Sequence, residues 1–233
     1  MRARLALAAS AALAAALAPA RARAQEVLDQ GIFLITREGV EIGREEFAIR
    51  ATPGRQGRPG VLAVATDHYQ GREVRAALEL TNDHVPVSYQ VDVSVGGRLA
   101  ERLSSQAGRG RFAVRVVTAA GEVVREFPVP AGAVVLDDDG FDQFYFVPRP
   151  DGDAPRAVSL LRPRETSVIA GEVRGAGDDT VIVGGHPTIA RHFVLTLAGG
   201  PTREFWFSPA GSLLKVANPA RSIAATRLSL PPR

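Results

Sequence analysis

The sequence predicts a mainly β protein: a strongly curved antiparallel sheet, a half-barrel or β-roll, of about a dozen strands with a short helix on its concave side. Hydrophobic and polar residues alternate with period two along most of residues 25–233, the pattern of half-buried strands. Turn signals containing glycine separate these runs at short intervals, which favours antiparallel hairpins. One face of each run is apolar and the other mostly charged, and a one-sided sheet of that size curls.

The clearest alternating runs are residues 72–80, 88–95, 111–118 and 191–197. Glycine pairs follow two of these runs, at Gly96-Gly97 and Gly199-Gly200. Residues 51–60 and 148–155 lack the alternation and are expected to be loops. Because the chain on either side of the second loop is short for a closed core of its own, we expect a single β-rich domain over residues 25–233.

The first residues have the features of a secretory signal peptide. Arg2 and Arg4 precede an apolar run, residues 5–17, that is too short to span a bilayer. Ala22-Arg23-Ala24 fits the small-x-small cleavage pattern. We therefore expect residues 1–24 to be a signal peptide, cleaved near Ala24, and the protein to be periplasmic or secreted. No long apolar run follows, so no integral membrane segment is expected in the mature chain.

Charge and cysteine content narrow the classes of function. The first 24 residues hold four of the 28 basic residues and none of the 25 acidic ones, so residues 25–233 carry 24 basic and 25 acidic groups, a formal charge of −1. Such a balance argues against nucleic acid as a partner, because nucleic-acid binding needs a clustered basic excess. The chain has no cysteine. A disulfide framework is therefore excluded, and stability must come from a hydrophobic core.

The segment VLDDDGFDQFYFVPRP, residues 134–149, combines acidic and aromatic residues most densely. A calcium loop needs oxygen ligands at alternating positions followed by a distant glutamate. Asp137, Asp138 and Asp139 are consecutive instead, and an extended backbone would point them to opposite sides. We therefore predict no metal site. Paired catalytic carboxylates with partners from elsewhere in the fold remain open.

The same segment fits a capped helix better. Phe141, Phe144 and Tyr145 fall at i, i+3 and i+4, on one face of a helix. Asp138 or Asp139 would cap its first N–H groups, and the prolines that follow would end it. Such a helix would act as a plug on the concave side of the sheet. A strand over the same residues, favoured by aromatic β-propensity, is the alternative.

Other motifs do not assign a chemistry. Ser212 and Lys215 match an S-x-x-K pattern, but they follow a glycine in an apparent hairpin and the companion motifs of serine enzymes are absent from the sequence. His186 and His192 would make a weak zinc signal. We therefore predict no enzyme, no catalytic residue and no cofactor.

Three segments carry a resemblance to a group of known proteins: REGVEIGREEFAI (37–49), LDDDGFDQFYFV (136–147) and GGHPTIARHFVL…TREFWFSPAGSLLKV (184–216). They are similar to blocks of uncharacterised exported bacterial proteins, which form families of unknown function. The resemblance implies a curved antiparallel half-barrel around a helix, similar to the periplasmic lipoprotein carrier. It also implies an apolar groove on the concave side. The chain differs from the carrier in length and block motifs, so the carrier's cargo and partners are not transferred.

Two functions from different classes follow. The first is a non-enzymatic module that binds a lipid or other hydrophobic small molecule in an apolar groove. The candidate groove residues, which a packed core would use equally well, are Val91, Val93, Phe112, Val114, Phe141, Phe144, Tyr145, Phe193, Leu195, Phe205 and Phe207. The alternative is a structural or assembly factor of the cell envelope that binds a protein or polysaccharide partner through strand edges or a charged face.

Overall fold

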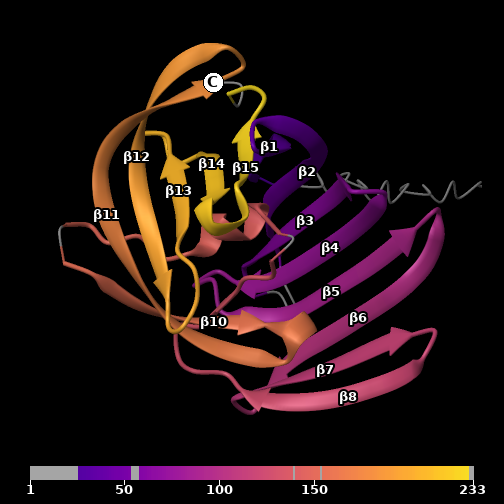
Figure 1. Ribbon diagram of the computed structural model, residues 1–233. Coiled ribbons are helices and arrows are strands. Elements are labelled where there is room, and N and C mark those ends of the chain that lie inside the picture. Colours follow the sequence, from indigo (N-terminus) through magenta and orange to yellow (C-terminus); the bar gives the residue numbers. More distant parts are fainter. Residues whose placement is uncertain (1–25, 54–57, 139, 153, 231–233) are drawn as a thin grey trace, which may run out of the picture.

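The computed structural model describes residues 26–53, 58–138, 140–152 and 154–230. In this part of the chain, fifteen strands form one curved, open sheet (Figure 1). The strands are β1 (Val27–Arg37), β2 (Val40–Thr52), β3 (Gly60–Tyr69), β4 (Arg72–Thr81), β5 (Pro86–Val95), β6 (Arg98–Gly108), β7 (Arg111–Thr118), β8 (Gly121–Pro128), β9 (Val134–Val135), β10 (Arg156–Arg162), β11 (Ser167–Val183), β12 (His186–Leu197), β13 (Arg203–Phe207), β14 (Leu213–Asn218) and β15 (Ile223–Arg227). The mainly β, curved antiparallel fold is thus confirmed, with more strands than expected. The expected signal peptide and its cleavage site lie outside the described residues.

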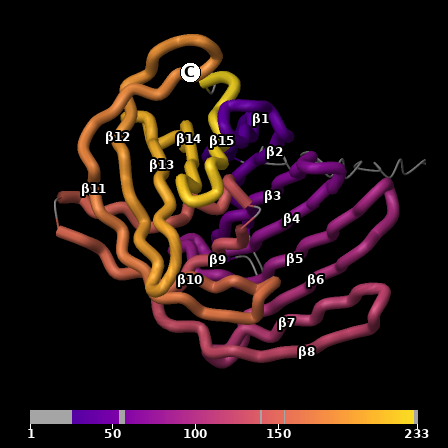
Figure 2. The backbone as a smooth tube through the Cα atoms, viewed as in Figure 1, coloured from indigo at the N-terminus to yellow at the C-terminus, as the bar shows by residue number. Residues whose placement is uncertain are grey.

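The sheet consists of two meanders that meet at the first and last strands. Its order is β8-β7-β6-β5-β4-β3-β2-β1-β15-β14-β13-β12-β11-β10-β9. Neighbours are antiparallel except the short β9–β10 pair, which is parallel. In the tube drawing, the indigo-to-magenta N-terminal strands form one wall and the orange-to-yellow C-terminal strands form the other (Figure 2). β8 and β9 are the two edges of the sheet, so the roll is not closed.

The hairpin turns explain why consecutive strands pair. Gln70 and Gly71 link β3 to β4 with φ of 51° and 73°, and Gly96 and Gly97 link β5 to β6 with φ of 58° and 76°. Two successive positive φ values are typical of the type I′ turn, whose twist matches that of the flanking strands. The turn signals read from the sequence therefore mark real hairpins.

A continuous core fills the concave side. Alternate residues of many strands point inward, as in β5, where Tyr89, Val91 and Val93 are buried. The opposite face of β13 is also buried. Its Trp206 packs in a second hydrophobic cluster with residues of β11, β12 and β14. This explains the aromatic residues on both faces of that strand.

The expected short helix is not an α-helix, and no α-helix occurs among the described residues. Asp142–Phe146 instead form one turn of 3-10 helix, η2, which lies between the two walls in Figure 1. Its N-cap is Phe141, which makes no side-chain cap, so the predicted cap by Asp138 is wrong. Asp139 lies outside the described residues. The free N–H groups at its start are bound by a distant carboxylate, described below, rather than by a local cap.

Candidate functional site

Two acidic residues point into the core from adjacent strands. Glu45 on β2 and Asp67 on β3 are cross-strand partners in the β2–β3 register. Both are buried, Glu45 completely. Burial, together with the neighbouring negative charge of Asp67, raises the pKa of the Glu45 carboxyl well above its usual value. Like charges directly opposite each other destabilise a sheet, and a proton retained on this pair removes that repulsion.

Glu45 holds η2 against the inner face of the sheet. Its Oε2 accepts a hydrogen bond from the Phe141 N–H at 2.8 Å, and its Oε1 accepts one from the Asp142 N–H at 2.7 Å. These donors have no partner within the turn itself. A carboxyl 96 residues upstream of Phe141 thus performs the capping role expected of the local aspartates.

A second set of contacts extends from η2 to β5. The Gln143 side chain accepts a hydrogen bond from the Asp137 N–H at 2.7 Å and donates one to the Tyr89 hydroxyl at 3.0 Å. Burial, and secondly the Asp137 charge, raises the pKa of the Tyr89 hydroxyl well above its usual value. Burial raises the pKa of the Asp142 carboxyl to about 7. These hydrogen bonds join groups of the chain itself, and they position η2.

A small cavity lies beside this network. It has a volume of about 40 Å³, enough for a water molecule or so but not for an acyl chain. Asp67 and Asp137 lie on its wall, as do the predicted plug residues Phe141 and Phe144. We call it the inner cavity. The concave side of the roll is therefore nearly filled.

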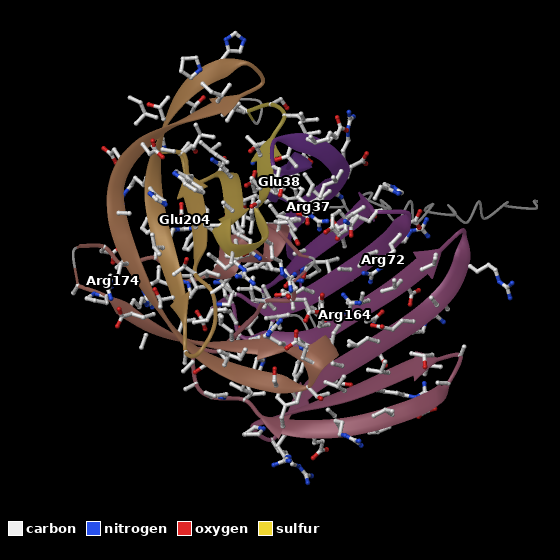
Figure 3. The ribbon with its side chains drawn as sticks, in the orientation of Figure 1. Arg37, Glu38, Arg72, Arg164, Arg174 and Glu204 are labelled. Atoms are coloured by element: carbon white, nitrogen blue, oxygen red, sulfur yellow. The ribbon has the colours of Figure 1, made fainter. Side chains whose placement is uncertain are left out.

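Three arginines converge on one carboxylate at this cavity. Asp138 Oδ1 lies 3.0 Å from Arg162 Nη2 and 3.4 Å from Arg203 Nη2, and Asp138 Oδ2 lies 3.0 Å from Arg221 Nη2. We call these four residues, which all line the inner cavity, the arginine cluster. Figure 3 shows many charged side chains in the space between the two walls, where Arg164 and Arg37 are labelled.

A larger hollow opens at the end of η2. This cleft has a volume of about 590 Å³. Tyr145, Phe193 and Phe207 contribute aromatic surface to it. The Arg149 guanidinium carbon lies 3.8 Å from the centroid of the Phe207 ring, and that of Arg191 lies 5.5 Å from the centroid of the Phe193 ring. Burial, and less strongly the positive charge of Arg191, lowers the pKa of Arg149 below its usual value.

The structure brings the predicted groove residues into one core but not into one groove. All of them belong to the main hydrophobic cluster or pack against it. Phe141 and Phe144 line the inner cavity, whereas Tyr145, Phe193 and Phe207 line the cleft. The others line neither hollow: Val91, Val93, Phe112, Val114, Leu195 and Phe205.

The sequence interpretation missed the polar groups of these sites. Glu45 shares strand parity with the apolar residues Phe47 and Ile49, and Asp67 shares it with Ala63 and Ala65. An acid at an inward position of an alternating strand was therefore a readable signal. The converging arginines carried no such signal, because they come from segments that only the sheet order brings together.

Comparisons with protein-family models, curated proteins and solved structures found no match. In the described part of the chain, no helix has the length and apolar character needed to cross a membrane. Within the same residues, no group of three or more histidine, aspartate or glutamate side chains is arranged to hold a metal ion.

Proposed function

We propose that this protein is an exported, periplasmic, non-enzymatic binding protein for a lipid or other hydrophobic ligand, and that the ligand occupies the cleft. The observation that carries the proposal is the cleft of about 590 Å³ with Tyr145, Phe193 and Phe207 on its wall. Ligand sites are typically a few hundred Å³ or more and are walled by apolar and aromatic side chains. The inner cavity is too small for this role.

The charged groups of the cleft favour an amphipathic ligand. Arg149 and Arg191 lie over two of the aromatic rings, and the two guanidinium groups repel each other, while Asp151 on the same wall attracts Arg149. A ligand carboxylate between them would relieve that repulsion, while its apolar part would cover the rings. Burying apolar surface stabilises the complex by roughly 25 cal/mol per Å², before the cost of ordering the ligand. A fatty acid has both parts.

The first experiment is native mass spectrometry of the protein purified from a bacterial periplasm, with lipid extraction of the same sample. The measured mass also tests export, because removal of the signal peptide would leave a chain that begins near residue 25. We expect a stoichiometric apolar adduct, and saturable binding of a fluorescent fatty acid to the delipidated protein. Tyr145→Asp places a charge on the cleft wall and should weaken that binding at least tenfold.

The matched control for this substitution is Val124→Asp. Val124 lies on β8, is 57% exposed and does not line the cleft, so the change adds the same charge outside the cleft and should leave binding unchanged. A clean apo mass together with no saturable binding would overturn the proposal. So would an equal loss of affinity in Tyr145→Asp and Val124→Asp.

A second candidate function, an envelope assembly factor, is favoured by edge strand β8. Its Val123 and Val124 side chains are 46% and 57% exposed, and β8 has a sheet neighbour on one side only, β7. An open edge can pair with a strand from another protein. This candidate predicts that Val124→Lys abolishes recovery of a defined envelope partner, whereas Tyr145→Asp does not. The reverse result would reject it.

A further inference from the structure

The arginine cluster joins elements that are distant in the sequence. Arg162 ends β10, Arg203 begins β13, and Arg221 ends η4 (Pro219–Arg221), the 3-10 turn between β14 and β15. Their guanidinium groups all contact the carboxylate of Asp138. The side chains of Arg162, Arg203 and Asp138 are 17%, 11% and 26% exposed, and that of Arg221 is 54% exposed. The cluster is thus largely shielded but open to solvent on the Arg221 side.

Three guanidinium groups share the Asp138 carboxylate. Outside the cluster, Glu165 pairs with Arg162, and Asp67 and Asp137 lie on the same cavity wall. Burial lowers the pKa of Arg203 below its usual value, and the positive charges of Arg221 and Arg162 lower it further. The three guanidinium groups therefore lie close together at Asp138, where shielding from water strengthens their mutual repulsion.

The cavity wall also contains a polar atom without a partner. Asn218 is 7% exposed and lines the inner cavity. Its side-chain oxygen Oδ1 is buried and accepts no hydrogen bond among the described residues. A buried acceptor of this kind is costly unless a donor reaches it. A ligand that suits this wall therefore offers oxygens to guanidinium groups and a hydroxyl to Asn218.

We propose that the arginine cluster is a binding site for a phosphate group, either inorganic phosphate or a phosphate monoester, which takes the place of the Asp138 carboxylate. Phosphate oxygens match the fork geometry of guanidinium groups. A singly protonated phosphate also carries the hydroxyl that the Asn218 oxygen lacks. Asp67 and Asp137, which are buried on the same cavity wall, repel an anion, so the phosphate would be held at the arginines. The site shares no lining residue with the cleft and does not depend on the proposed lipid.

The test is calorimetric titration with inorganic phosphate and with glycerol phosphate, at constant ionic strength set with chloride. Asp138→Asn removes the competing charge and keeps the side-chain shape, so it should tighten phosphate binding about tenfold. Arg221→Gln removes one cation at the exposed side and should weaken binding several-fold. The matched control, Arg174→Gln, removes an exposed arginine paired with Glu172 and should change nothing.

Circular dichroism of each variant establishes that it is folded, and Arg221→Gln keeps the test decisive should Asp138→Asn fail to fold. The proposal would be overturned if phosphate produced no heat of binding in the wild type or in any folded variant. It would also be overturned if Arg221→Gln and Arg174→Gln changed the affinity for phosphate equally. Vesicles with and without phosphatidic acid identify the source: binding to the acidic vesicles assigns a lipid headgroup, and binding of soluble phosphate alone assigns a free anion. Tyr145→Asp should leave phosphate binding intact, which separates this proposal from the cleft.

Discussion

Glu45 shows how a residue distant in the sequence can take the place of a local helix cap. It occupies an inward position of β2, where its neighbours of the same parity are apolar, and burial alone would make a carboxyl there costly. The cost is offset because its two oxygens accept the N–H groups of Phe141 and Asp142. The same bonds remove the need for an aspartate cap before η2. A buried acid in the core of this protein is therefore a structural anchor.

The buried carboxyls should make stability depend on pH in an unusual direction. The pKa of Asp142 is raised to about 7 in the folded protein, against about 3.9 in an unfolded chain. Between these values the folded state holds a proton that the unfolded state has released, so the free energy of unfolding falls as pH rises from about 4 to about 7. The raised pKa of Glu45 acts in the same direction.

Asp142→Asn tests this dependence, because an amide cannot ionise. We expect the variant to gain about 2–4 kcal/mol over the wild type at pH 8 and much less at pH 4, measured by urea unfolding at both values. The control is Asp92→Asn on the outer face, where a hydrogen bond from Arg102 lowers the pKa of the carboxyl. Its small effect should have the opposite sign. A wild type whose stability rises through this pH range would contradict the assignment.

At the scale of elements, Arg227 stabilises the seam, the β1–β15 pairing at which the two meanders meet. Its side chain is fully buried against Asp29, with 2.8 Å between Nη1 and Oδ1. It also donates hydrogen bonds to the carbonyl oxygens of Leu213, Ser229 and Gln30. One side chain of β15 thereby contacts β1 and β14. It crosses β1 at Gly31, where an added Cβ would lie 2.8 Å from Arg227 Nη2, so a larger residue at this position would displace the guanidinium group.

Breaking this pair should destabilise the whole sheet. Arg227→Met leaves Asp29 as an unpaired buried charge, which costs about 3–5 kcal/mol. Adding Asp29→Leu should recover part of the loss, because the orphaned charge is then gone. The exposed pair of Arg102 and Asp92 supplies the control, since Arg102→Met should cost much less than Arg227→Met. Equal losses in urea unfolding for the buried and exposed arginines would reject this role.

At the scale of the whole molecule, sequence patterns predicted what is local and missed what is distant. Period-two alternation and glycine turns are properties of a few neighbouring residues, so the strands, the hairpins and the curved sheet could be read from them. The group that caps the turn at residues 142–146 could not be read in this way, because it comes from β2. The arginine cluster was equally hidden, since β10, β13 and η4 meet only through the sheet order. Aromatic content likewise predicted the core residues, but not which of them would border a hollow.

The seam between β1 and β15 sets the order in which this protein can be completed. Phe33 of β1 lies opposite Arg227 of β15, so this pairing must wait until nearly the whole described chain is available. The β1–β8 meander needs only neighbouring contacts and can assemble early, whereas contacts so distant in sequence form slowly. A chain that emerges amino end first therefore holds β1 as an open edge until β15 arrives. During that interval, a strand from another copy can occupy the place of β15. The chain is therefore most prone to mispairing between copies just before its last strand is added.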